Sequence, residues 1–209
     1  MIEIGFLMKE YKPEQSLTDL EYGKGILKSV INQPGPKQKR PCPTCDSPCP
    51  CSGSRICACN CSYECPSLPR QLSLDPDRYP IEKEIIPLVF AINSLHACPS
   101  YWSCEGHENA NGQLIKPPRV NFYSSSTILP SLIVECLVVL SFKKVIRFRW
   151  KVTSAGMTEN LQAQYIIEPD VNIGEKNILS TLQADVRCIA DNLFAGVKDK
   201  AFSKLRALN

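Results

Sequence analysis

The chain has 209 residues, enough for one globular domain with an extension, and its 44% hydrophobic and 22% charged residues are typical of a soluble folded protein. A net charge of +3 is too small to indicate nucleic-acid binding by itself. The first residues include acidic side chains and lack the apolar run of a signal peptide, and no apolar run is long enough to span a bilayer. We therefore expect a soluble, cytoplasmic protein with no membrane partner.

The composition divides the chain into four regions. Residues 1–40 are polar and weakly patterned, and they end in NQPGPKQKRP, a basic stretch with proline and glycine that is typical of a flexible linker. We expect little packed structure there. A cysteine-rich module follows at residues 41–66, a proline-rich connector at residues 67–79, and a patterned domain at residues 80–209.

Eight of the twelve cysteines lie in the module, in a stretch with no helix or strand period. In a reducing cytosol such a cluster indicates metal coordination, whereas disulfides are the alternative for an exported protein. Eight thiolates suit two tetrahedral zinc sites, a C-x3-C-P ending favours an iron–sulfur cluster, and soft sulfur ligands also suit Cu(I). Because so short a module cannot build a hydrophobic core, bound metal would supply its folding free energy. The predicted ligands are Cys42, Cys45, Cys49, Cys51, Cys57, Cys59, Cys61 and Cys65.

The hydrophobic period of the patterned domain predicts alternating helices and strands. The run PIEKEIIPLVFAINSL has helical spacing, with Pro80 at its first position and Pro87 either kinking the helix or starting a shorter one. Further helices are predicted at residues 128–140 and 175–197, and strands at residues 101–104, 119–123, 144–152 and 162–168. This order predicts an α+β fold, a small and mostly antiparallel sheet with helices packed on one face, attached to the N-terminal cysteine-rich metal-binding module.

The last predicted helix carries an apolar seam with charged residues opposite it. We interpret Asp185, Asp191 and Lys198 as its solvated side.

The segment CPSYWSCEGHENANG holds one of the two histidines of the chain. Cys98, Cys104 and His107 are a candidate set of three metal ligands, and Cys104 with His107 is also a candidate catalytic pair of nucleophile and base. Gly106 permits a tight turn, and the polar ENANGQ stretch is interpreted as a mobile loop over it. The alternative is a plain strand-end turn with a buried cysteine.

Positive charge is concentrated in the predicted strand KVIRFRWKV. Its alternation places Arg147, Arg149 and Lys151 on one face, where they are candidate substrate-binding residues for phosphate oxygens of RNA or of a nucleotide. The alternative is an exposed sheet face that stays soluble through its charges, with Glu168 of the next strand partly neutralising them.

Residues 81–107 resemble the opening of the tRNA wybutosine-synthesising methyltransferase family, in which a helix ending in Ile-Asn precedes a strand and a Ser-Cys-Ser-Gly-Arg signature. The chain departs from that signature at Glu105 and His107, and it lacks the family's later Trp and His signatures. The resemblance implies S-adenosylmethionine-dependent methylation of a modified tRNA guanosine, with Ser103 and Gly106 at the cofactor. Neither a Rossmann fingerprint nor a P-loop supports this activity independently. The matching residues are Ile92, Asn93, Ser103, Cys104 and Gly106.

Two functions therefore remain open from the sequence. The first is a cytoplasmic metal-binding protein, whose zinc or iron–sulfur module serves structure, electron transfer or docking. The second is an RNA-modifying, methyltransferase-like enzyme centred on the SCEGH turn, with Cys104 and His107 as its catalytic residues. An RNA or protein partner would bind through the cysteine module or the basic strand.

Overall fold

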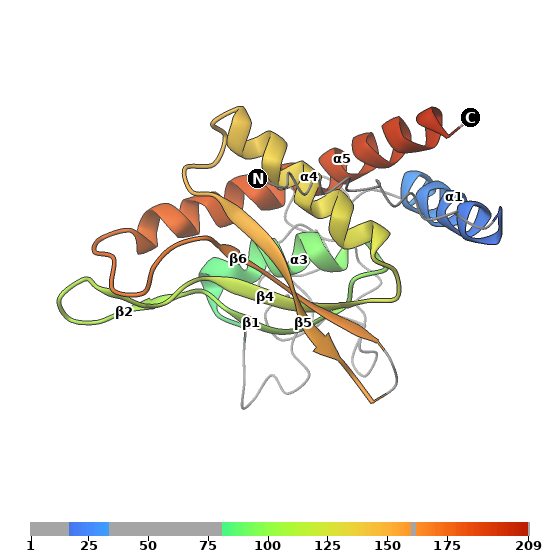
Figure 1. The fold of residues 1–209 in the computed structure, drawn as a ribbon. Coiled ribbons are helices and arrows are strands. Elements are labelled where there is room, and N and C mark those ends of the chain that lie inside the picture. The colour runs from blue at the N-terminus through green and yellow to red at the C-terminus, as the bar shows by residue number, and fades with distance from the viewer. Residues whose placement is uncertain (1–16, 34–80, 160–161, 209) are drawn as a thin grey trace, which may run out of the picture.

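A computed structural model describes residues 17–33, 81–159 and 162–208 (Figure 1). The predicted cysteine module and connector lie outside these residues. The described elements, in chain order, are α1 (Leu17–Asn32), the 3-10 helix η1 (Lys83–Ile85), α3 (Ile86–Asn93), β1 (Ser100–Cys104), β2 (His107–Glu108), β3 (Leu114–Lys116), β4 (Arg119–Ser124), α4 (Ile128–Phe142), β5 (Trp150–Met157), β6 (Ala163–Pro169) and α5 (Leu179–Ala207).

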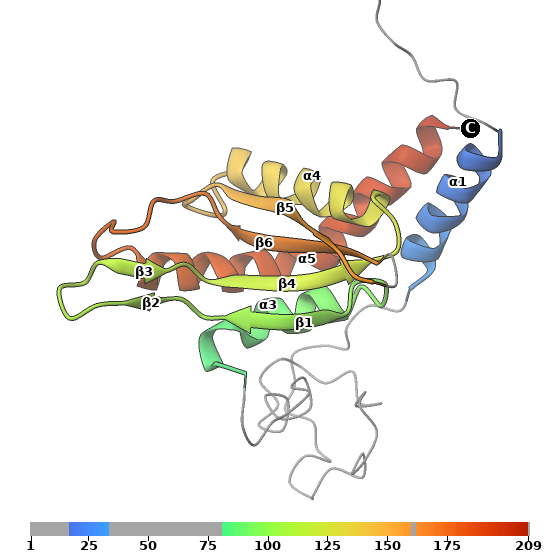
Figure 2. The ribbon, with the colours of Figure 1, turned by 60° about the horizontal axis from the view of Figure 1, so that its bottom comes forward.

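The main sheet has four strands in the order β1-β4-β6-β5, and every neighbouring pair is antiparallel. Val120 of β4 lies opposite Ser103 of β1 and opposite Ile167 of β6, and Ile167 lies opposite Val152 of β5. Figure 2 shows α3, α4 and α5 behind the sheet, so the apolar side chains of this row face the helices. The predicted α+β class with a small antiparallel sheet is confirmed.

Helix α5 is the centre of the packing, because α1, α3 and α4 all contact it. The predicted apolar seam is confirmed as buried from Leu182 to Leu193, whereas Ile178, its first predicted member, precedes the helix and is half-buried. The helix begins four residues later than predicted and continues well beyond the predicted end at residue 197. Within the described part of the chain, no helix combines the length and the apolar character needed to cross a membrane. The buried seam residues are Leu182, Val186, Ile189, Leu193, Val197 and Ala201.

Helix α1 contradicts the prediction of little packed structure in residues 1–40. Leu27 and Val30 are buried in the common core, and α1 packs along α5. The ammonium of Lys198 donates to the carbonyl of Gln33 at 3.0 Å, so Lys198 joins the two helices. A helix with so few buried positions gains most of its stability from tertiary packing, which a local period does not reveal.

The predicted strand over residues 144–152 is displaced, since β5 begins at Trp150. The N–H groups of Arg147 and Phe148 each donate to the carboxylate of Asp185 at 2.8 Å, and Trp150 Nε1 lies 3.4 Å from it. Asp185 is 2% exposed, so its interpretation as a solvated residue is wrong. β5 therefore begins only after Arg147 and Phe148, whose N–H groups bind Asp185.

The predicted helix at residues 80–95 is divided. The 3-10 turn η1 comes first, and Pro87 lies in the first turn of α3. Proline suits that position because its missing N–H has no partner in the first turn of a helix. Of the two alternatives for Pro87, the shorter helix is therefore confirmed.

We predict that Asp185→Ala lowers the free energy of unfolding by at least about 2 kcal/mol, because two part-buried backbone N–H groups and the buried indole N–H of Trp150 lose their charged acceptor. Asp199→Ala, an exposed aspartate on the same helix, is the matched control and should change it by less than about 0.5 kcal/mol. Urea denaturation followed by circular dichroism measures both. Equal effects in the two variants would contradict the assigned role of Asp185.

Candidate metal centre at Glu82, Cys104 and His107

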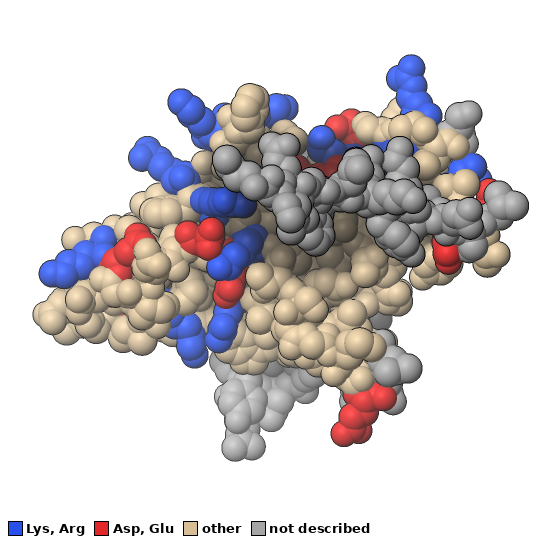
Figure 3. Space-filling model, viewed as in Figure 1, with Lys and Arg blue, Asp and Glu red and all other residues tan. Residues whose placement is uncertain are grey.

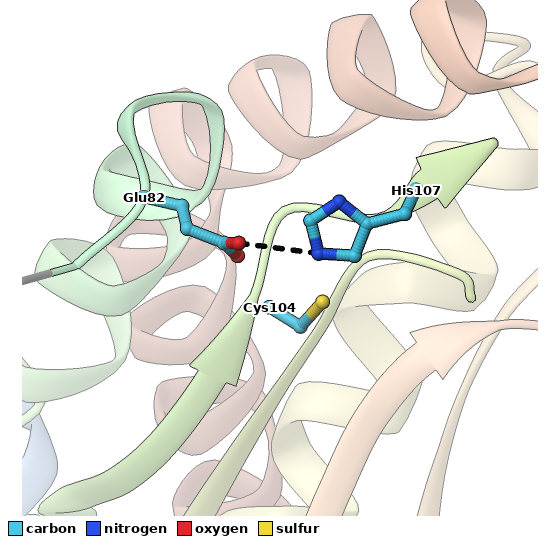
Figure 4. A group of neighbouring side chains, drawn as sticks. All are labelled: Glu82, Cys104 and His107. Atoms are coloured by element: carbon cyan, nitrogen blue, oxygen red, sulfur yellow. Dashed lines mark ion pairs between the residues drawn. The ribbon is translucent and has the colours of Figure 1, made fainter. Parts of the chain in front are cut away.

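Three potential metal ligands converge where η1 begins, β1 ends and β2 begins (Figure 4). The carboxylate of Glu82, the sulfur of Cys104 and the imidazole of His107 have ligand atoms that all lie within 4.8 Å of one another. His107 Nε2 is 3.2 Å from Glu82 Oε1. Cys104 is 3% exposed, whereas the side chains of His107 and Glu82 are 47% and 36% exposed. The group is therefore anchored by a buried sulfur and open to solvent at its nitrogen and oxygen donors.

Gly106 forms the turn between two of these ligands. Its φ is +87°, in the left-handed region that favours glycine. A Cβ at this position would lie 2.7 Å from Leu179 Cδ1 and 2.9 Å from the backbone nitrogen of Pro118. The turn thus needs glycine for two reasons, and it reverses the chain so that Cys104 and His107 both approach Glu82.

Hydrogen bonds tie the segment of Glu82 to this turn. The N–H of Glu105 donates to Glu82 Oε2 at 2.7 Å, and the N–H of Glu84 donates to Glu105 Oε2 at 2.9 Å. Gln183 of α5 donates to the carbonyl of Glu105 at 3.2 Å, and Arg187 of α5 forms an ion pair with Glu84. Backbone donors that hold a ligand carboxylate fix its orientation, as the outer contacts of metal sites do.

The ENANGQ stretch, predicted as a mobile loop, is the tip of a hairpin that β2 and β3 form, with only Glu108 in a strand. Asn109 Oδ1 accepts from the N–H groups of Asn111 at 2.9 Å and Gln113 at 3.0 Å, which closes its tip as an Asx turn. The segment before α5 holds β3 in turn, because Leu114 exchanges backbone hydrogen bonds of 2.8 Å with Glu175 and Gly174. This anchoring holds the strand pair that begins with His107.

Cys98 does not belong to the group, contrary to the predicted ligand set of Cys98, Cys104 and His107. It is fully buried, and burial raises the pKa of its thiol to about 12 despite a hydrogen bond with Ser124. Glu82 takes the third place. No sequence signal marks Glu82 as a ligand, because only the packing of η1 against the end of β1 brings it near.

Burial raises the pKa of the Cys104 thiol, and the nearby Glu82 carboxylate adds to this, whereas the Gly106 N–H and Lys116 lower it. Both a metal ligand and a nucleophile are thiolates, so the pKa does not separate the two predicted roles of Cys104. Thiolate, imidazole and carboxylate are the usual zinc ligands, and a tetrahedral ion with their normal bond lengths separates its ligands by about 3.3 to 3.6 Å. The observed spacing is compatible with that geometry after small side-chain movements.

Ser103 and Gly106, the predicted cofactor-binding residues, are not members of this group. Ser103 is on β1 opposite Val120, and the space beside Gly106 is filled by Pro118 and Leu179. Gly106 thus has a packing role, and cofactor binding by Ser103 and Gly106 stays a prediction.

The predicted basic residues lie near the β5 edge of the sheet, whereas the candidate centre lies at the end of β1, which is the other edge strand. Arg147 and Arg149 are exposed as predicted but lie before β5, and Lys151 Nζ binds Asp170 Oδ1 at 2.9 Å. Figure 3 shows basic side chains projecting around the end of α4 and the start of β5. These residues do not join the candidate centre.

Comparisons with family models, with curated proteins and with solved structures find no match for this chain. The methyltransferase resemblance therefore stays a prediction, and the functional argument depends on the geometry of the site.

We predict that Gly106→Ala destabilises the protein more than Gly174→Ala does. Both glycines have positive φ, at +87° and +92°, but a Cβ at Gly174 would meet no atom within 4 Å. The control variant Gly174→Ala should therefore lower the free energy of unfolding only by the conformational cost of a positive φ, about 1 to 2 kcal/mol. Gly106→Ala has the same cost and a steric clash in addition. Thermal unfolding of the two variants gives the difference. A loss no larger than that of the control would show that the turn accommodates a side chain.

We also predict that stability falls as the pH rises from about 9 to 11. Burial raises the pKa of Cys98 to about 12 and that of Cys136 to about 11. Above pH 9 the unfolded chain loses these protons while the folded chain keeps them, so each thiol lowers the unfolding free energy by up to about 1.4 kcal/mol per pH unit. The double variant Cys98→Ala/Cys136→Ala should show a flatter dependence in urea titrations at pH 8 to 10.5. Cys188→Ala is the control, and a double variant as steep as the control would refute the assignment.

Proposed function

We propose that this chain is a metal-binding protein whose α+β domain holds a divalent ion, zinc by its donor set, at Glu82, Cys104 and His107. The observation that supports this is the convergence of oxygen, sulfur and nitrogen donors from three separate segments within 4.8 Å. Two hydrogen bonds join the segment of Glu82 to the turn after Cys104: the N–H of Glu105 donates to the carboxylate of Glu82, and the N–H of Glu84 donates to the carboxylate of Glu105. The fold therefore holds these two segments together.

The number and exposure of the ligands favour a centre with an open coordination position. Structural zinc sites are closed by four protein ligands, whereas catalytic sites have three and keep one position for water or substrate. Among the described residues the group has three members, and its nitrogen and oxygen donors are partly exposed. Such an ion acts as a Lewis acid on a bound oxygen. The zinc or iron–sulfur module predicted at residues 41–66 is a separate proposal, outside the described residues.

Cobalt substitution tests the centre. Because the clustered cysteines would also bind cobalt, the background is the full chain with all eight of them replaced by serine. We predict binding of one Co²⁺ with a thiolate-to-cobalt absorption band, which Cys104→Ser abolishes. His107→Ala should weaken Co²⁺ binding by more than about 100-fold, since even outer contacts of metal sites contribute about 10- to 100-fold.

The chain offers matched controls for both ligands. His96→Asn changes the other histidine, at a positive φ of 53° that asparagine tolerates, and Cys188→Ser changes a thiol outside the group. Both controls should keep the absorption band and the affinity, and circular dichroism should show that every variant is folded. A background chain that binds no cobalt, or a band that survives Cys104→Ser, would overturn the proposal.

A further inference from the structure

Two cationic side chains share one aromatic ring beside the candidate centre. Lys116 Nζ lies 5.6 Å from the ring centroid of Trp102, and Arg119 Cζ lies 4.8 Å from it. Within the described residues neither cation forms an ion pair with a carboxylate. Arg119 Nε is also buried, with no acceptor among the residues that the structure describes. Like charges gathered in this way repel each other, and a buried donor without a partner is uncommon in native proteins, so both features favour a bound anion.

The strand registers place each cation next to a ligand of the proposed metal. Lys116 lies opposite His107 in the β2–β3 pair, and Arg119 lies opposite Cys104 in the β1–β4 pair. Directly opposed residues of antiparallel strands have Cβ atoms about 4.5 to 5.5 Å apart on the same face. An anion between Lys116 and Arg119 would therefore lie within reach of the open coordination position.

We propose that Lys116 and Arg119 bind the phosphate group of a phosphate ester, whose oxygen occupies the open position of the metal; this inference rests on the proposed metal centre. The guanidinium offers paired donors that match phosphate oxygens, and the ammonium adds a compact positive charge. Arginine, lysine and a metal ion together are a recurring environment for phosphoryl groups. Trp102 is 39% exposed, and the part of its side chain that the two cations leave exposed provides apolar surface for the organic part of the ester.

Calorimetry on the zinc-loaded, eightfold-serine full chain tests this with four probes: adenosine 5′-monophosphate, adenosine, inorganic phosphate and a short single-stranded oligonucleotide without terminal phosphates. We expect the monophosphate to bind at least about tenfold more tightly than adenosine. Tighter binding of the oligonucleotide would assign the ester to a polynucleotide backbone and support the proposal. Equal affinity for inorganic phosphate would overturn the ester assignment, and equal affinity for adenosine would overturn the anion site.

The variants Lys116→Gln and Arg119→Ala should each weaken phosphate-ester binding by about tenfold or more while the cobalt band of Cys104 stays unchanged. Arg206→Ala, at an exposed arginine in the last turn of α5, is the control and should leave binding intact. Unchanged affinity in both test variants, or loss in the control alone, would overturn the inference.

The metal and the anion site can fail separately. If the chain binds no cobalt, the proposed function fails, and the probes are repeated on the metal-free chain. If the metal-free chain binds the phosphate ester and Arg119→Ala removes that binding, the anion site at Lys116 and Arg119 is still supported. If the metal-free chain does not bind the ester, the anion site is overturned as well.

Discussion

The turn at Gly106 packs against Pro118 and Leu179 so closely that no side chain fits between them, and the position of the candidate centre follows from this contact. It brings the end of β1 against the start of α5, where Gln183 binds the carbonyl of Glu105. The helix that organises the core thereby also fixes the turn. Cys104 and His107, on either side of the turn, are therefore positioned by the packed core, which holds side chains more precisely than a surface loop does.

The two neighbouring glutamates of the site have different tasks. Glu82 presents its carboxylate to His107 and Cys104, whereas the carboxylate of Glu105 accepts from the N–H of Glu84 and the N–H of Glu105 donates to the carboxylate of Glu82. Glu105 and His107 are also the two positions at which the chain departs from the Ser-Cys-Ser-Gly-Arg signature.

The sequence predicted those parts of the fold whose apolar residues follow a complete local period, such as α4 and the seam of α5. It missed α1, because only Leu27, Val30 and the partly buried Ile31 mark the packed side among its described residues. It placed β5 too early, because the competing acceptor Asp185 is distant in the chain. Cys104 and His107 were recognisable from their spacing around a glycine. Glu82 was not, since its role depends on a tertiary contact that no local pattern records.

The short connection between β6 and α5 has a consequence for how such a fold can diverge. It pairs with β3 through Leu114 and so holds the hairpin that begins with His107. An added or deleted residue here would shift the hairpin relative to β1 and separate the imidazole from the sulfur. Relatives that keep the centre should therefore preserve the length of this connection, and also the hairpin tip, whose Gly112 carbonyl accepts from the N–H of Asn177 in the connection.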